Sequence, residues 1–232
     1  MEDQVTRQDN AEVSGLKIGV LGGTGPQGRG LAMRWARAGF TVVLGSRVAD
    51  RAAATAAELC DLAGVQTVTG LDNAACAAAV DVVVVAVPWH GHRELLEFLR
   101  HELVGKIVVD CVNPLGFDES GPFALRVEDG SAAQQAAALL PESRVTSAFH
   151  HVSAHRLADL SVSDMDVDVL VLGEDRAAID TVRALVDAIA GMRGVYGGRL
   201  RDAHQVEAFT ANLITVNRHH RALPGIRVID AS

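Results

Sequence analysis

The chain has 232 residues, of which 49% are hydrophobic and only 4% aromatic, and its formal net charge is −8. This length supports one good core, or a nucleotide-binding domain with a small appendage. The acidic balance, without a basic stripe, argues against nucleic acid and anionic membranes as partners. No apolar run is long enough to span a membrane. The polar start, residues 1–14, lacks a signal-peptide core and predicts a flexible tail on a cytoplasmic protein.

Buried-type strands and amphipathic helices alternate along most of the chain. The predicted strands cover residues 16–22, 41–45, 65–70, 80–88, 105–114, 144–152 and 166–173. The predicted helices cover residues 28–39, 49–64, 72–79, 131–140, 175–191 and 203–223. The almost continuous valine run at 80–88 is typical of a central parallel strand that is buried on both faces.

This alternation predicts an α/β fold with a Rossmann-type, doubly wound parallel sheet. Residues 115–131 are expected to form a loop, because "GFDESGPF" is a strong turn signal. We expect a nucleotide-binding domain at residues 15–140 and a small C-terminal α/β lobe at residues 141–232. The sheet is able to continue across that boundary.

The stretch Gly23-Thr24-Gly25-Pro26-Gln27-Gly28 fits the pattern G-x-G-x-x-G. It follows a predicted strand and opens a predicted helix, which is the context that supports a dinucleotide-binding turn. Gly23 is expected to allow the sharp turn, Gly25 to let the backbone approach the pyrophosphate, and Gly28 to let helix and strand pack closely. The N–H groups at the helix start then face the phosphates.

The end of the second strand indicates which cofactor binds. NAD-specific domains usually have an acidic residue about 20 positions after the glycine turn, but this chain has Gly45, Ser46 and Arg47 there. A serine hydroxyl and a guanidinium suit a phosphate, and Arg51 lies one helical turn further on. Thr24 adds a hydroxyl in the glycine turn. The sequence therefore predicts NADP(H) rather than NAD.

Two common proton donors of this fold are hard to place. Lys17 and Lys106 precede strands at the far edge of the sheet, and the only tyrosine, Tyr196, has no Tyr-x-x-x-Lys partner. The histidines that follow strands are candidate general acids, or wall residues that orient a ring: His90, His92, His150, His151 and His155. They lack cysteine or carboxylate partners at metal-ligand spacing, so no metal is expected. Cys60, Cys76 and Cys111 are expected to be buried thiols.

A substrate that exchanges a hydride without proton transfer at the reacting carbon needs no acid, and a reduced deazaflavin is such a substrate. The chain resembles the NADPH-dependent F420 reductase family (F420H2:NADP+ oxidoreductase). The matching stretches are "KIGVLGGTGPQGRGLAMRWARAG", "VVLGSR" with Arg51, "AVPWHGH", "VDCVNPL", "SAFHHVSAHRL" and "VEAFTANLITVNRHHR". They span roughly residues 16–222.

The resemblance implies a hydride transfer between NADP(H) and coenzyme F420, a homodimer, and roles for particular residues. Thr24, Ser46, Arg47 and Arg51 would hold the 2′-phosphate. The residues implied to line the cofactor or flank the nicotinamide are Val87, Pro88, Trp89, Asn113, Pro114 and Leu115. The residues implied at the stacked rings and the deazaflavin head group are His150, the candidate catalytic residue, with Val152, Arg193, Gly197 and Gly198.

Two other functions remain open at this point. One is an NADP-dependent reductase of a small organic substrate, with His150 or His90 as the acid. The other is a non-enzymatic NADP(H) sensor that uses the same domain to gate a partner, because fold alone does not fix chemistry.

Overall fold

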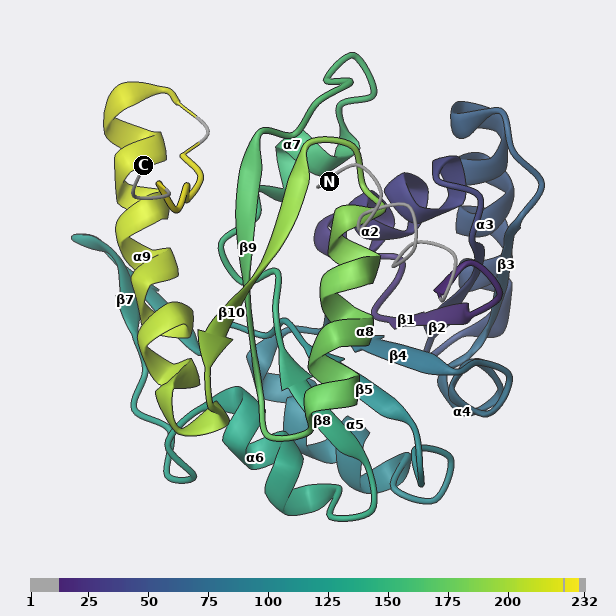
Figure 1. Ribbon diagram of the computed structural model, residues 1–232, viewed down its shortest axis with the longest axis horizontal. Helices are drawn as coiled ribbons and strands as arrows, with labels where there is room; N and C mark the ends of the chain where they lie inside the picture. The colour runs from purple at the N-terminus through teal and green to yellow at the C-terminus, as the bar shows by residue number, and fades with distance from the viewer. Residues whose placement is uncertain (1–12, 223, 230–232) are drawn as a thin grey trace.

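A computed structural model of the protein describes residues 13–222 and 224–229. An eight-stranded sheet runs through the molecule in the order β10-β9-β8-β5-β4-β1-β2-β3 (Figure 1). Its strands are β1 (Lys17–Leu21), β2 (Thr41–Ser46), β3 (Val68–Asp72), β4 (Val82–Val85), β5 (Ile107–Asp110), β8 (Arg144–Ser147), β9 (Val167–Gly173) and β10 (Met192–Gly198). The predicted α/β fold with a doubly wound sheet is therefore confirmed.

The strand directions change once within the sheet. All neighbouring pairs are parallel except β8 and β9, which pair antiparallel with Thr146 opposite Gly173 and Ser147 opposite Leu172. Strands β9 and β10 consequently run against the other six. Because of this reversal, the last residues of β9 lie level with the carboxyl end of β8.

Helices cover both faces of the sheet, each over its own apolar core. The first face packs against α2 (Pro26–Arg37), α3 (Ala49–Ala63), α7 (Ala154–Ala158) and α8 (Arg176–Asp187). The second packs against α4 (Asn73–Ala78), α5 (His92–Phe98), α6 (Ala132–Leu139) and α9 (Ala203–His220). Alternate residues of β4 point into the two cores: Val82 and Val84 into the first, Val83 and Val85 into the second. The valine run is therefore buried on both faces, as predicted.

Four local features differ from the sequence-based expectation. The predicted loop contains a β-hairpin, β6 (Leu115–Asp118) paired with β7 (Gly121–Ala124), which lies beside α9 (Figure 1). The strand predicted at 144–152 ends at Ser147, and Phe149 then adopts a φ of 65°. A short helix, α7, follows this turn. Of the predicted tail, residues 1–12 lie outside the described part of the chain, whereas Val13 is buried in the first core.

The expected domain boundary at residues 140 and 141 falls between α6 and β8. The sheet continues across it, because β8 pairs with β5. A separate C-terminal lobe stays a prediction. The three cysteines are buried and free, as expected. No helix in the described ranges is long and apolar enough to cross a membrane.

Candidate cofactor-binding site

The glycine-rich turn joins the carboxyl end of β1 to the start of α2. Its left-handed residue is Gly22, with a φ of 75°. A β-carbon on Gly22 would lie 2.5 Å from the carbonyl oxygen of Ala86, so this turn packs directly on the segment after β4. Gly28 serves the packing role expected of it. A β-carbon there would lie 2.8 Å from the carbonyl oxygen of Gly22 and 2.9 Å from the Cα of Gly23.

The start of α2 leaves backbone donors available to a ligand. Gly25 is the N-cap residue, no side chain caps the helix, and Pro26 occupies its first turn. The N–H groups of Gln27 and Gly28 have no intrahelical acceptor at this position and favour an anion. The Gln27 side chain is used elsewhere, because its Nε2 donates to the carbonyl oxygen of Phe149 at 3.2 Å. The turn after β1 is thereby fastened to the turn after β8.

Two arginines and a serine gather at the end of β2. The hydroxyl oxygen of Ser46 accepts a hydrogen bond from the N–H of Val48 at 3.3 Å, which leaves the hydroxyl proton free to donate to a ligand. Arg47 and Arg51 are exposed, and within the described residues neither guanidinium pairs with a carboxylate. This group suits an anion such as a phosphate.

A cavity of about 670 Å³ joins these elements at the carboxyl edge of the sheet. The predicted site residues that line it are Thr24, Gly25, Ser46, Arg47, Arg51, Val87 and Pro88. Its further lining residues include Asp72 and Asn73 at the start of α4, and His90, Glu94 and Phe98 on the side of α5. The volume falls within the range of small-molecule and cofactor sites. Sequence reasoning missed Asn73, Glu94 and Phe98, because no local motif marks them.

The residues implied for the nicotinamide and deazaflavin lie outside that cavity but share its edge of the sheet. Asn113, Pro114 and Leu115 follow β5, and His150 and Val152 follow β8. Gly198 is paired with Leu172, which is opposite Ser147 at the carboxyl end of β8. Strand register therefore brings the Gly197-Gly198 pair, the His150 turn and the Asn113 loop to one side of the molecule.

His150 is held from both its backbone and its ring. Its carbonyl oxygen accepts hydrogen bonds from Asn113 Nδ2 at 2.9 Å and from Thr210 Oγ1 at 3.2 Å, and its Nε2 lies 2.7 Å from the Ser147 hydroxyl. Burial lowers the pKa of His150 to about 4, although the carboxylate of Asp110 acts in the opposite direction. His150 is therefore uncharged at neutral pH, so its imidazolium form is not available there as a general acid.

His151 has a structural partner. The N–H of Leu170 in β9 donates to its Nε2 at 3.4 Å, and burial lowers the pKa of His151 to about 4 as well. Trp89 is half-buried, does not line the cavity, and has its ring centroid 5.4 Å from that of His92. These contacts could not be inferred from the order of residues in the chain.

Arg193 is not brought to the other predicted site residues. It lies near the start of β10, opposite Asp168, and its guanidinium donates to both carboxylate oxygens of Asp168 at 2.9 and 2.8 Å. It also donates to the carbonyl oxygen of Val228 at 2.6 Å. At about 3.3 Å per residue, its backbone is roughly 16 Å along the strand from Gly198. This arginine therefore fastens the C-terminal segment instead of facing the Gly197-Gly198 pair.

A buried polar network behind the site was not expected. His92, at the start of α5, contacts Asp110 at the end of β5 and Gln135 in α6. On α9, the two carboxylate oxygens of Glu207 accept the N–H groups of Ala132 and Ala133, at 2.9 and 3.2 Å, at the start of α6. Burial raises the pKa of Glu207 to about 7, against the lowering effect of these N–H donors.

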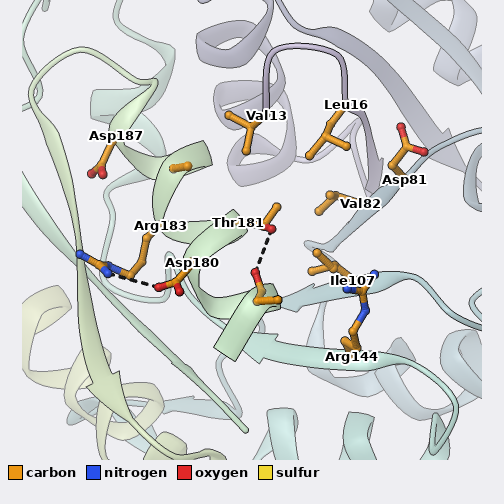
Figure 2. Close-up of a pocket in the computed structure, with 12 residues that line it drawn as sticks. Val13, Leu16, Asp81, Val82, Ile107, Arg144, Asp180, Thr181, Arg183 and Asp187 are labelled. Atoms are coloured by element: carbon orange, nitrogen blue, oxygen red, sulfur yellow. Dashed lines mark hydrogen bonds and ion pairs between the residues drawn. The ribbon is translucent and has the colours of Figure 1, made fainter. Parts of the chain in front are cut away.

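A second cavity, of about 620 Å³, opens at the other edge of the sheet (Figure 2). Val82 and Ile107, at the starts of β4 and β5, line one side, and Asp180 and Arg183 on α8 line the other. Ligands of open α/β sheets bind at the carboxyl ends of strands, and the glycine turn is at that opposite edge. The cavity at the glycine turn is thus the candidate cofactor site.

Comparison with known proteins agrees with this geometry. The family described as NADP oxidoreductase coenzyme F420-dependent matches residues 17–114. The F420-dependent NADP reductase of Methanothermobacter thermautotrophicus is 36% identical over 220 residues, which cover 92% of this chain and 94% of that protein. Its counterpart in Methanocaldococcus jannaschii is also 36% identical, over 92% of this chain and 98% of that protein. The chain belongs to the F420-dependent NADP reductase family.

The fold leads to the same family. A crystal structure from Arthrobacter sp. fb24, provisionally named an F420-dependent NADP reductase, superimposes with a TM-score of 0.80 at 26% identity. The match covers 93% of this chain and 100% of that one. The family resemblance inferred from the sequence is thereby confirmed. The roles of the individual site residues stay predictions.

Proposed function

We propose that this protein transfers a hydride between NADP(H) and the deazaflavin coenzyme F420. The observation that carries the proposal is the cavity at the glycine turn, whose β2 end presents the Ser46 hydroxyl and the guanidinium groups of Arg47 and Arg51. Neither guanidinium pairs with a carboxylate in the described part of the chain. Those groups suit the 2′-phosphate that distinguishes NADP from NAD. The F420-dependent NADP reductases of the two archaeal relatives support the choice of redox partner.

The residues present fit NADP(H). The N–H groups at the start of α2 would bind the pyrophosphate, and Thr24, Ser46, Arg47 and Arg51 would bind the adenosine phosphate. Val87 and Pro88 would line the cofactor as it passes the end of β4. The two coenzymes supply the hydride chemistry, between C4 of the nicotinamide and C5 of the deazaflavin. The protein then contributes alignment of the rings and exclusion of water.

The nicotinamide and deazaflavin rings would lie against the segments that follow β5 and β8 and against the last residues of β10. Asn113, Pro114 and Leu115 would flank the nicotinamide, and Val152 would lie beside the stacked rings. Gly197 and Gly198 would let the backbone reach the deazaflavin head group. His150 would act as a positioning residue, because its ring is buried and uncharged at neutral pH and its carbonyl oxygen is fixed by Asn113 and Thr210. A neutral, buried imidazole also speaks against the alternative in which His150 is the acid for a small organic substrate.

The direct test is reduction of F420 by NADPH in the purified full-length protein. Loss of the visible absorbance of oxidised F420, dependent on both NADPH and enzyme, is expected. A folded protein that binds NADPH but leaves F420 oxidised would overturn the proposal and favour the small-substrate reductase or the NADP(H) sensor. Binding without turnover is measured separately, by the fluorescence change of NADPH.

The proposed working unit is a homodimer formed through β7 and α9. A groove of about 470 Å³ runs between them, and Phe123, Phe209 and Val216 expose 44%, 44% and 39% of their surface there or next to it. Exposed apolar patches of this kind favour a protein interface. Phe209→Glu should give a monomer by light scattering if the proposal is correct. If the Phe209→Glu protein remains a dimer, the interface does not lie at β7 and α9.

The same proposal places the enzyme in the cytoplasm. Its three cysteines are free and buried, which suits a reducing compartment. Fractionation of cells that express the protein checks this location.

A further inference from the structure

Asn73 is the first residue of α4 and forms part of the wall of the cofactor cavity. Only 7% of this residue is exposed, and its side-chain oxygen Oδ1 has no hydrogen-bond partner within the described residues. Leaving a buried amide oxygen without a partner costs free energy, so such groups call for an explanation. Beside a ligand cavity, the simplest explanation is a partner on the ligand.

The position of this amide relative to β2 points to the part of the ligand concerned. A β-carbon on Gly45 would lie only 2.9 Å from Asn73 Oδ1, so the amide oxygen lies directly over the end of β2. NAD-specific domains place an acidic side chain at this strand end to accept a hydrogen bond from the adenosine ribose. The torsion that turns an amide group is broad, so the orientation of this amide can adapt to a ligand in the cavity.

The charges around Asn73 favour a neutral group at this position. The residues that line the cavity include two guanidinium groups, Arg47 and Arg51, and two carboxylates, Asp72 and Glu94, so these formal charges are equal in number without forming ion pairs. Asp72 directly precedes Asn73 and caps α4 by accepting the N–H of Ala75 at 2.9 Å. A third carboxylate here would cancel much of the attraction for a 2′-phosphate. An amide oxygen accepts a hydrogen bond without repelling the phosphate.

We propose that Asn73 is a further cofactor-binding residue, whose amide oxygen accepts a hydrogen bond from the adenosine ribose and whose neutrality preserves the preference for NADP(H). Since the 2′-oxygen of NADP carries the phosphate, the hydroxyl that donates is the 3′-hydroxyl. This inference rests on the proposed function, because it takes NADP(H) as the occupant of the cavity.

The first test removes the amide. Asn73→Ala keeps a good helix former in α4 and should weaken the binding of NADP+ and NAD+ alike, each by about tenfold, because both carry the 3′-hydroxyl. Dissociation constants are measured by calorimetry, without F420 and without turnover. Constants within twofold of those of the unmodified protein for both nucleotides would overturn the proposal.

The second test adds only a charge. Asn73→Asp keeps the shape and the acceptor, and it should weaken NADP+ binding by at least about tenfold while leaving NAD+ within about threefold. Gln66→Glu is the matched control, because it adds the same charge at an exposed position before β3, at the other end of that strand. An unchanged ratio of the two constants in Asn73→Asp, with thermal melting that reports a folded protein, would overturn the proposal.

Failure of the proposed function gives a different pattern. Unmodified protein that binds NAD+ as tightly as NADP+, or that leaves F420 oxidised, would contradict the proposed function whatever the Asn73 variants do. An unmodified protein that prefers NADP+ and reduces F420, combined with unaffected Asn73 variants, would contradict only the role assigned to Asn73.

Discussion

The imidazole of His92 lies 2.5 Å from the carboxylate of Asp110, and neither side chain has any exposed surface. This contact joins the start of α5 to the end of β5. Burial alone would lower the pKa of His92, but the charge of the Asp110 carboxylate and the hydrogen bonds that the imidazole donates to Asp110 and Gln135 outweigh it and hold that pKa above its ordinary value. The second oxygen of Asp110 accepts the N–H of Val112 at 3.0 Å. The pair thus braces the segments that follow both β4 and β5.

Replacing the histidine of this pair should destabilise the folded protein. His92→Leu keeps a similar volume but leaves the Asp110 carboxylate buried without its partner, so we expect a loss of about 3–5 kcal/mol in the free energy of unfolding. Asp110→Asn should cost less, because an amide N–H can donate to a neutral imidazole. Urea titrations measure both.

The control for this prediction is an exposed ion pair on the same helix. Arg93 and Glu97 are about half-exposed and 3.5 Å apart, and Glu97→Gln should change stability by less than about 1 kcal/mol. A His92→Leu protein no less stable than Glu97→Gln would contradict the bracing role of the pair.

Acid should destabilise the protein through two buried histidines. His150 and His151 have pKa values of about 4 in the folded chain against an ordinary value of 6.5, so the unfolded chain binds more protons between these limits. Their contribution is complete above pH 6.5 and is lost as the pH falls toward 4, by about 3 kcal/mol for each histidine. His92 acts in the opposite sense, because its raised pKa gives a contribution that is lost as the pH rises through that value.

This pH dependence is measured by urea unfolding at several pH values together with NMR titration of the imidazole C–H resonances. His151→Asn should remove about half of the loss of stability between pH 6.5 and 4. Resonances of His150 and His151 that titrate near pH 6.5 would contradict the burial argument.

Arg47 should determine cofactor preference if it binds the 2′-phosphate. Arg47→Ala removes a charge-assisted hydrogen bond, so NADPH binding should weaken by about 10- to 100-fold while NADH binding changes little. Arg176→Ala is the matched control, since that exposed arginine on α8 pairs with Asp180 away from the cavity. Equal weakening of NADPH and NADH by Arg47→Ala would exclude the phosphate contact.

Gly28 should not tolerate a side chain. The added β-carbon of Gly28→Ala would lie within 3 Å of backbone atoms of Gly22 and Gly23, which cannot move without opening the glycine turn. We expect a loss of about 1–3 kcal/mol in stability together with weaker NADPH binding. Gly15→Ala, whose β-carbon meets nothing within 4 Å, is the control and should be close to neutral. Thermal melting and NADPH fluorescence report the two effects.

The local part of the site could be predicted from the sequence because its signals lie within one βαβ unit. The glycine turn, Ser46, Arg47 and Arg51 are separated by short, countable distances, and the structure places them around one cavity. Even here the positive φ of Gly22, just before the motif, could not be predicted, because the pattern of glycines does not reveal which of them adopts it.

The remaining contacts depend on partners far apart in the chain. Gln27 and Phe149 are 122 residues apart, and His92 and Asp110 are joined only by the pairing of strands and helices around them. Hydrophobic alternation marks β9 as a strand but carries no information on its direction, so the reversal relative to β8 could not be read from it. Asn73 likewise has no local signal, because its significance comes from Gly45 on a neighbouring strand.

The crowding around Gly45 also limits how this enzyme can be re-engineered toward NADH. A β-carbon at that residue would lie 2.9 Å from Asn73 Oδ1, 3.0 Å from Leu21 Cδ2 and 3.2 Å from Cys76 Sγ. An aspartate or glutamate at Gly45 would therefore fit only if these three side chains shifted. Libraries of variants designed to use NADH should keep Gly45 unchanged and vary its neighbours, Ser46 and Arg47.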